Sequence, residues 1–365
     1  MKALWNKIKN WMNTNNHLLW VSIIALVVLG LLGMYFVGPY EAARHHFEPN
    51  IFFNKFWPFA LVGIITLFAF SKLSNKWMIR ISWILGIFAF LLMLITIFYP
   101  VYILGASRFA YIFGTPINPY MVMLPPYIVL MSHWLSKDKA NKKWITIGTT
   151  ALTLFIVLAA INAPYIFMAQ VYMLLFVIMT FKARKNIPGA FYLGIGTLIT
   201  FVAFMILAVF MLPHIQMRLM HLFNNGNFLY HTQAWWLVHS LTHSTFIGNT
   251  PESLLALKLL PGSTGDFMFT SMVAKFGYLV GLLILGLYGC IAKGLINLIR
   301  NTKDGFAKML TTGTLGMFAI FVFMALAVAF GLLETAAYWP LISFGGTMLL
   351  IWCMLFGFVL ATNKK

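Results

Sequence analysis

"LLWVSIIALVVLGLLGMYFV", residues 18–37, is an apolar run without a charged residue. A helix of about 20 such residues crosses the hydrocarbon core of a bilayer. No small-residue cleavage pattern follows the run, so we expect a spanning helix and not a cleaved signal peptide. Hydrophobic residues make up 61% of the chain and charged residues only 9%, and similar runs recur along its length. The sequence therefore predicts an all-α polytopic membrane protein.

Apolar windows predict ten transmembrane helices within a single transmembrane domain, residues 1–365. We expect both termini in the cytoplasm and one large outer loop, residues 213–266, between the seventh and eighth helices. Pro125 and Pro126 predict a kink in the fourth helix and a groove beside it. The expected spans lie near residues 18–38, 56–71, 81–99, 119–135, 144–161, 165–181, 189–212, 267–292, 309–333 and 341–361.

The distribution of charge supports this orientation. With both termini in the cytoplasm, the cytoplasmic segments hold 19 of the 25 lysine and arginine residues, which agrees with the positive-inside bias. The same bias explains the net charge of +18 better than nucleic-acid binding does, because the chain offers no soluble basic domain. Acidic residues contribute little to orientation, so their concentration outside suggests chemistry. Five of the seven acids are expected outside: Glu41, Glu48, Glu252, Asp266 and Glu334.

Asp266 lies in the stretch "LPGSTGDFMF", residues 260–269, directly before a long apolar run. Aspartate is a preferred N-cap, so one interpretation is that it caps the eighth helix. The other interpretation is catalysis, because ionisable groups at the membrane are often functional. Both interpretations stay open on the pattern alone.

A second candidate is Arg108 in "LGASRFAYIFGTPINPY", residues 104–120, just outside the third helix. It fits either an arginine that reaches lipid headgroups from an aromatic belt or a bidentate anion site for a phosphate. His239 and His243 have the i, i+4 spacing of two metal ligands. No third ligand is placed beside them, so we predict an amphipathic helix with Trp235 and Trp236 and no metal site.

Several motifs occur together, in order, and with them the chain resembles the SEDS family of FtsW, RodA and SpoVE. The family signature before the eighth helix, Leu-Pro-Glu-x-His-Thr-Asp-Phe-Ile-Phe, is matched at Leu260, Pro261, Asp266, Phe267 and Phe269, followed by Gly277. The signature at the last helix, Pro-Phe-Ile-Ser-Tyr-Gly-Gly-Ser, is similar to residues 340–347. The first outer-loop signature is echoed by Arg108-Phe109, Gly114-Thr115-Pro116 and Asn118-Pro119, and a Tyr-Gln-x-x-Gln stretch by Tyr230 and Gln233.

The chain also departs from the family pattern. Gly262 stands where the signature before the eighth helix has glutamate, and Thr264-Gly265 replaces the His-Thr of the same signature. Residues 118–121 lack the acid of the family's Gln-Pro-Ser-Glu, and residues 162–164 do not carry its Gln-Pro-Asp-Leu-Gly-Thr motif. The resemblance therefore identifies the fold more firmly than the activity.

The resemblance implies a peptidoglycan glycosyltransferase of the bacterial plasma membrane that polymerises lipid II outside the membrane, in cell division or cell-shape maintenance. It implies that Asp266 is the general base, that a class B penicillin-binding protein is the partner, and that a divalent cation, Mg or Mn, accompanies the diphosphate. No nucleic-acid partner is expected. The diphosphate would bind Arg108, Arg218, Lys258 and Lys275, and further candidate residues are Glu252, Gln233 and Ser343.

Two alternatives belong to other classes of function. A non-catalytic scaffold or regulator of the cell-wall machinery would keep the fold after losing the acids. A flippase for a lipid-linked precursor would carry paired charges near the membrane midplane. The intramembrane candidates for such charges, His133 and Lys275, lie near helix ends, which disfavours transport.

Overall fold

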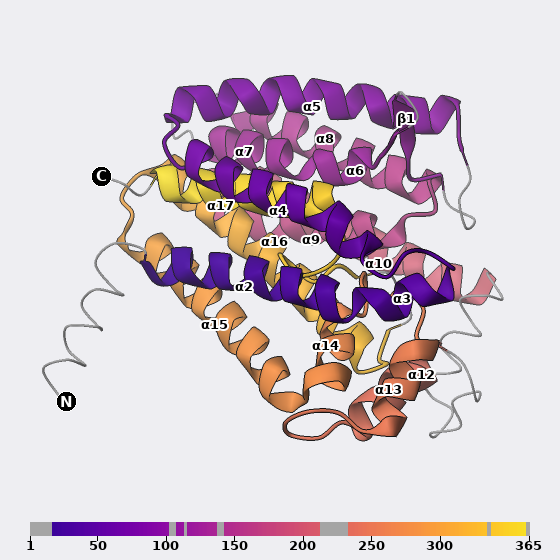
Figure 1. Cartoon of the computed structure of the whole chain (residues 1–365). Coiled ribbons are helices and arrows are strands. Elements are labelled where there is room, and N and C mark those ends of the chain that lie inside the picture. The colour runs from indigo at the N-terminus through magenta and orange to yellow at the C-terminus, as the bar shows by residue number, and fades with distance from the viewer. Residues whose placement is uncertain are drawn as a thin grey trace, which may run out of the picture. The chain divides into compact units, whose positions relative to one another are not determined.

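A computed structural model describes residues 17–101, 107–112, 115–136, 142–211, 233–333 and 337–362. This part of the chain is built almost entirely of helices (Figure 1). Seven of its helices are long and apolar enough to cross a membrane, which confirms a polytopic helical chain. They are α2 (His17–Phe36), α4 (Ile51–Phe70), α5 (Asn75–Phe98), α8 (Lys142–Asn162), α9 (Ile166–Ala183), α15 (Tyr278–Asn301) and α16 (Gly305–Ala329).

Two shorter apolar helices fall on other expected spans. They are residues 188–203 within α10 (Pro188–Met211) and α17 (Gly346–Thr362). The number of ten spans, the orientation of the termini and the extent of the outer loop stay predictions. Residues 213–232 of that loop lie outside the described residues.

The structure interrupts one predicted span and starts another later than expected. The span expected at 267–292 is interrupted at Gly277, which separates α14 (Met268–Phe276) from α15. Gly277 has φ +92° and ψ 174°, a conformation that only glycine adopts easily and that ends a helix. The last span starts at Gly346 and not at residue 341, because residues 340–344 form turns around Leu341, which has φ +69°.

The span expected at 119–135 divides at Met123 into α6 (Pro119–Val122) and α7 (Leu124–Leu135). The fourth predicted span is therefore not one continuous helix, in agreement with the kink predicted at Pro125 and Pro126, and the groove beside it stays a prediction. Both prolines lie in the first turn of α7, where a missing N–H is tolerated. The carbonyl of Tyr120, next to the break, accepts a hydrogen bond of 2.6 Å from the Tyr172 hydroxyl.

One part of the described chain departs from the all-α prediction. Residues 110–112 and 115–117 form an antiparallel pair of strands, β1 (Ala110–Ile112) and β2 (Thr115–Ile117), in which Tyr111 is paired with Pro116. This stretch is rich in aromatic and β-branched residues, which favour extended backbone. The all-α prediction therefore needs this small correction.

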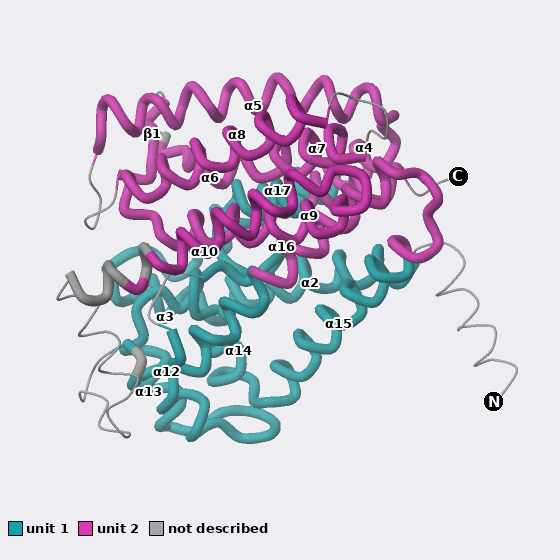
Figure 2. The backbone as a smooth tube through the Cα atoms, turned by 180° about the vertical axis from the view of Figure 1, so that it is seen from behind, with its two compact units in different colours: residues 1–65, 217–297, 321–352 teal, residues 66–216, 298–320, 353–365 magenta. Residues whose placement is uncertain are grey.

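The chain divides into two compact units, which Figure 2 distinguishes by colour. Unit 1 contains residues 1–65, 217–297 and 321–352, and unit 2 contains residues 66–216, 298–320 and 353–365. In unit 2, α5 packs on α7, and α8, α9 and α10 pack on one another. In unit 1, α14 packs on α2, α12 (Gln233–Thr242) and α13 (Pro251–Leu259), and α13 packs on α3 (Gly38–Arg44). Asp266 lies in unit 1.

Candidate active site

Asp266 belongs to a run of tight turns, residues 261–267, which connects α13 to α14 and is called the acid turn below. Gly262 starts it with φ +73°. The Gly262 carbonyl then accepts hydrogen bonds from the N–H groups of Gly265, at 3.0 Å, and Phe267, at 3.3 Å. These short-range bonds close the turn around Asp266.

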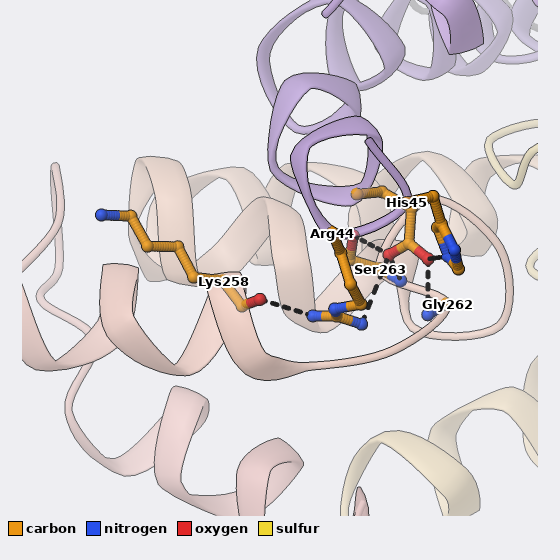
Figure 3. A network of polar contacts seen from close by, with 6 residues as sticks. Arg44, His45, Lys258, Gly262 and Ser263 are labelled. Carbon is orange, nitrogen blue, oxygen red and sulfur yellow. Dashed lines mark hydrogen bonds and ion pairs between the residues drawn. The ribbon is translucent and has the colours of Figure 1, made fainter. Parts of the chain in front are cut away.

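A carboxylate from another part of the chain, Glu41 of α3, binds the start of the acid turn at Gly262 and Ser263, which Figure 3 labels. Its Oε1 accepts from the Gly262 N–H at 3.1 Å. Its Oε2 accepts from the N–H of Ser263 at 2.9 Å and from the Ser263 hydroxyl at 2.7 Å. Glu41 is only 5% exposed, so these bonds form away from bulk water.

Two basic residues of the same segment, Arg44 and His45, also contact Glu41. His45 Nε2 lies 3.2 Å from its Oε1, and an Arg44 guanidinium nitrogen lies 3.8 Å from its Oε2. Burial opposes ionisation of Glu41, but the hydrogen bonds from Ser263 and Gly262 and the charge of Arg44 outweigh it. The pKa of Glu41 is therefore lowered from its ordinary value of 4.5.

The later part of the acid turn is held by the segment before α17. The Ser343 hydroxyl donates to the Gly265 carbonyl at 2.8 Å and accepts from the Trp339 N–H at 2.9 Å. The Phe344 N–H donates to the Thr264 carbonyl at 2.8 Å. The acid turn thus has buried partners at both of its ends, and Ser343 supplies one of them.

Asp266 is partly exposed, while its Oδ1 atom is shielded from solvent. The N-cap residue of α14 is Phe267, so Asp266 precedes the cap position by one residue. The prediction that Asp266 is the N-cap residue of this helix is therefore wrong. A carboxylate held by a fixed backbone at the edge of solvent has the setting that a general base needs.

A cationic pocket of ≈ 320 Å³ lies between α3 and the end of α13, lined by Pro39, Tyr40, Ala43, Arg44 and Lys258. Arg44 donates to the Lys258 carbonyl at 2.6 Å, and Figure 3 shows the Lys258 side chain extending away from the Arg44 guanidinium. The Lys275 ammonium donates to the Tyr40 hydroxyl at 2.8 Å. The structure thus brings two of the predicted cations, Lys258 and Lys275, to one region with Arg44.

The other predicted cations are placed differently. Arg108 lies in unit 2, directly before β1, with its guanidinium 5.5 Å from the Phe109 ring centre and 5.6 Å from that of Tyr165. Such stacking fits both interpretations of this residue. Arg218 lies outside the described residues.

The remaining candidates lie on α12 and α13. Gln233 is the exposed first residue of α12, and Glu252 is exposed in the first turn of α13. On α12, the His239 and His243 rings are 3.9 Å apart, and the Trp235 ring stacks on His239 at 4.5 Å. Burial and the neighbouring His243 lower the pKa of His239 from 6.5, against the charge of Glu252.

A divalent cation stays a prediction. Across the described ranges, no group of three or more His, Cys, Asp or Glu side chains could hold a metal ion. The Glu41 carboxylate is turned toward N–H and O–H donors, which a metal ligand would not face. The proposed mechanism therefore has no step that uses a metal ion.

Sequence reasoning missed Glu41 and Arg44 as parts of the site. It placed Glu41 outside the membrane by its position after the first expected span and gave it no role in the site. A signal was present in "GPYEAAR", residues 38–44, where an acid and a base stand at i, i+3 in a short segment between two spans. That spacing predicts a pair on a helix, but not its partners in the acid turn.

Comparison with known proteins agrees with this architecture. The probable peptidoglycan glycosyltransferase FtsW of Trichlorobacter lovleyi is 23% identical over 351 residues, which cover 91% of this chain and 88% of that protein. The solved RodA of Thermus thermophilus matches with a TM-score of 0.64 at 19% identity, over 97% of this chain and 98% of RodA. A chain of a solved peptidoglycan synthase complex matches with a TM-score of 0.75 at 18% identity, over 95% of this chain and 96% of that one.

Long apolar helices and these relatives define a multi-pass protein of the bacterial plasma membrane. The sequence model of the family of FtsW, RodA and SpoVE, described as a cell cycle protein, matches residues 16–365. The chain belongs to this family, as its motifs predicted.

Proposed function

We propose that this protein is a peptidoglycan glycosyltransferase that polymerises lipid II on the outer membrane face, with Asp266 as its general base. The observation that carries the proposal is the partly exposed Asp266 carboxylate in a turn fixed by Glu41 and Ser343. Support comes from the family and from relatives named as peptidoglycan glycosyltransferases. The whole chain then serves as one transmembrane domain.

In this mechanism Asp266 takes the proton from the 4-hydroxyl of the acceptor sugar. The hydroxyl oxygen bonds to the anomeric carbon of the donor sugar, and the bond from that carbon to the diphosphate breaks. The undecaprenyl diphosphate leaves with the electron pair. One positioned base contributes about 10²–10⁴-fold to such a rate.

In the proposed mechanism, cationic side chains of unit 1 stabilise the leaving diphosphate. Arg44 and Lys258 line one pocket, and Lys275 reaches the Tyr40 hydroxyl in its wall. Guanidinium and ammonium groups bind phosphate oxygens by charge-assisted hydrogen bonds. We assign the diphosphate to this pocket, and Arg108 and Arg218 remain further candidates for the same ligand.

A class B penicillin-binding protein is the proposed partner, because it would crosslink the strands that this chain makes. A structural relative belongs to a peptidoglycan synthase complex in which polymerisation and crosslinking are coordinated. The partner would be a transpeptidase in the same membrane.

The test is polymerisation of purified lipid II by the purified full chain, with and without a candidate transpeptidase. Asp266→Asn should lower the rate by about 10²-fold or more and leave the thermal unfolding midpoint close to wild type. Glu48→Gln removes an exposed acid and serves as the matched control. Unchanged polymerisation by Asp266→Asn would remove the mechanism, and an inactive wild type in both arms would favour a non-catalytic scaffold.

A further inference from the structure

We propose that Glu41 is a positioning residue, whose carboxylate fixes the acid turn and thereby the location of Asp266. This inference rests on the function proposed above. Glu41 itself has no assigned contact with substrate, and it acts through the backbone of Gly262 and Ser263.

The geometry concentrates three hydrogen bonds of Glu41 on two consecutive residues. Both carboxylate oxygens are used, at 3.1 Å to the Gly262 N–H and at 2.9 and 2.7 Å to the N–H and hydroxyl of Ser263. Asp266 follows three residues later, and the Gly262 carbonyl is bonded to the N–H groups on either side of it. A shift of Gly262 would therefore move the catalytic carboxylate directly.

The contacts require a carboxylate and not merely a polar side chain. Every group of the acid turn that meets Glu41 is a hydrogen-bond donor. An ionised carboxylate accepts at both oxygens, whereas an amide of the same shape has one acceptor and one donor. In Glu41→Gln, an NH₂ group would face an N–H or O–H donor at one of the two positions.

The buried charge of Glu41 is itself compensated. Arg44 and His45 both contact its oxygens, so the ionised form is stable in spite of burial. Arg44 also lines the cationic pocket, so Glu41→Gln could change diphosphate binding through Arg44. Ser263→Ala removes one hydroxyl donor while leaving the Glu41–Arg44 pair, and it separates the two effects.

Displacing a catalytic group by about 1 Å costs about 10²-fold in rate. A positioning role therefore predicts a lower kcat with little change in KM. We expect Glu41→Gln to lower kcat by about 10-fold to 10²-fold and Ser263→Ala to lower it less. In the double variant the two effects should not multiply, because both substitutions break the same contact.

The experiment combines lipid II polymerisation kinetics with amide hydrogen exchange of residues 260–268 in the purified full chain. Glu41→Gln should speed exchange at Gly262 or Ser263 by about tenfold or more, because an NH₂ group replaces one of the two acceptor oxygens. Glu48→Gln makes the same chemical change at an exposed acid of the same segment and should match wild type in both measurements.

Faster exchange together with a reduced kcat supports the inference. Wild-type exchange in Glu41→Gln, or faster exchange with full kcat in both Glu41→Gln and Ser263→Ala, overturns it. If wild-type protein does not polymerise lipid II, the proposed function fails separately, and the exchange measurement still decides whether Glu41 fixes the turn. A Glu41→Gln protein that does not fold leaves Ser263→Ala to decide by the same criteria.

Discussion

Two predicted spans, residues 119–135 and 267–292, are interrupted for different reasons. In the first, the carbonyls of Met121 and Val122 would accept from residues 125 and 126, and both of these are prolines without an N–H. In the second, no proline occurs near the break at Gly277. Instead, residues 245–248 supply hydrogen-bond partners for the backbone groups on either side of Gly277. The Gly248 N–H donates to the Phe276 carbonyl, and the Tyr278 N–H donates to the Thr245 carbonyl, each at 2.9 Å.

The difference shows what kind of interruption a sequence can predict. The first break follows from the chemistry of the interrupted residues themselves. The second depends on backbone from a separate segment, which enters between α14 and α15. The second break also makes residues 268–276 a short, separate helix that follows the acid turn. The interruption that sequence patterns missed is therefore the one beside the candidate active site.

The strongest test of this comparison is Gly277→Ala. The conformation of Gly277 is nearly restricted to glycine, and a Cβ there would lie 2.7 Å from the Phe246 carbonyl oxygen. Backbone strain of 1–3 kcal/mol plus the clash should lower stability by about 3 kcal/mol or more. Thermal unfolding of the detergent-solubilised chain, followed by tryptophan fluorescence, measures the loss.

Gly286→Ala is the matched control for this substitution. Gly286 lies in α15, and a Cβ at this position would meet nothing within 4 Å. Its variant should unfold at the wild-type temperature or slightly above it. Equal midpoints for the two variants would show that the backbone of residues 245–246 does not define the second break.

Ser343→Ala should have the next largest effect, because it removes a partner of the acid turn before α14. The Gly265 carbonyl and the Trp339 N–H would each lose a bond to the buried Ser343 hydroxyl. Unsatisfied buried groups cost about 1–3 kcal/mol, so we expect a loss of about 2 kcal/mol. Ser74→Ala, at an exposed serine, is the control in the same thermal measurement. A loss no larger than that of the control would show that the turn does not need this bond.

Much of the fold is predictable from the sequence because it depends on local properties. Apolar runs define the membrane spans, and the Pro125-Pro126 pair defines the break before α7. The break at Gly277 is not predictable in this way, since glycine is also common within transmembrane helices. The backbone conformation of Gly277 and the nearby carbonyls of Thr245 and Phe246 together make glycine necessary there.

The candidate site divides in the same way. Asp266 follows from its motif, and Lys258 and Lys275 follow from their charge in the same region of the chain. Glu41 and Arg44 could not be assigned from the sequence, because their partners lie more than 200 positions away. Glu41 meets Ser263 across 222 positions, and Arg44 meets Lys258 across 214. Only the packing of α3 on α13 brings these residues together.

The acid turn should also respond to pH through Glu41. The pKa of Glu41 is lowered in the folded chain, so its contribution to stability is complete above its unfolded value of 4.5. That contribution is lost as the pH falls below 4.5 and through the lower, folded value. The stability difference between wild type and Glu41→Gln should therefore stay constant from neutral pH to about pH 5 and shrink below it.

Thermal unfolding midpoints from pH 7 to pH 3.5 measure this difference. His45 contacts the same carboxylate, so His45→Gln is introduced into both proteins being compared and the His45 side chain cannot contribute to the difference. A difference that grows as the pH falls below 4.5 would contradict an ionised Glu41 in the acid turn. A constant difference over the whole range would show that the Glu41 charge contributes nothing there.

The smallest effect is expected from Pro126→Ala, at the other interrupted span. Alanine supplies an N–H that can donate a hydrogen bond to the Val122 carbonyl. The backbone at Met123 already has helical angles of φ −73° and ψ −15°, so this bond needs little rearrangement. This added bond contributes about 0.5–1.5 kcal/mol, while losing the stiff proline costs about 0.4–1 kcal/mol through the unfolded chain. The two nearly cancel, so the unfolding midpoint should stay within about 1 kcal/mol of wild type. A loss as large as that of Gly277→Ala would mean that the first break, like the second, is maintained by surroundings that favour an interrupted helix.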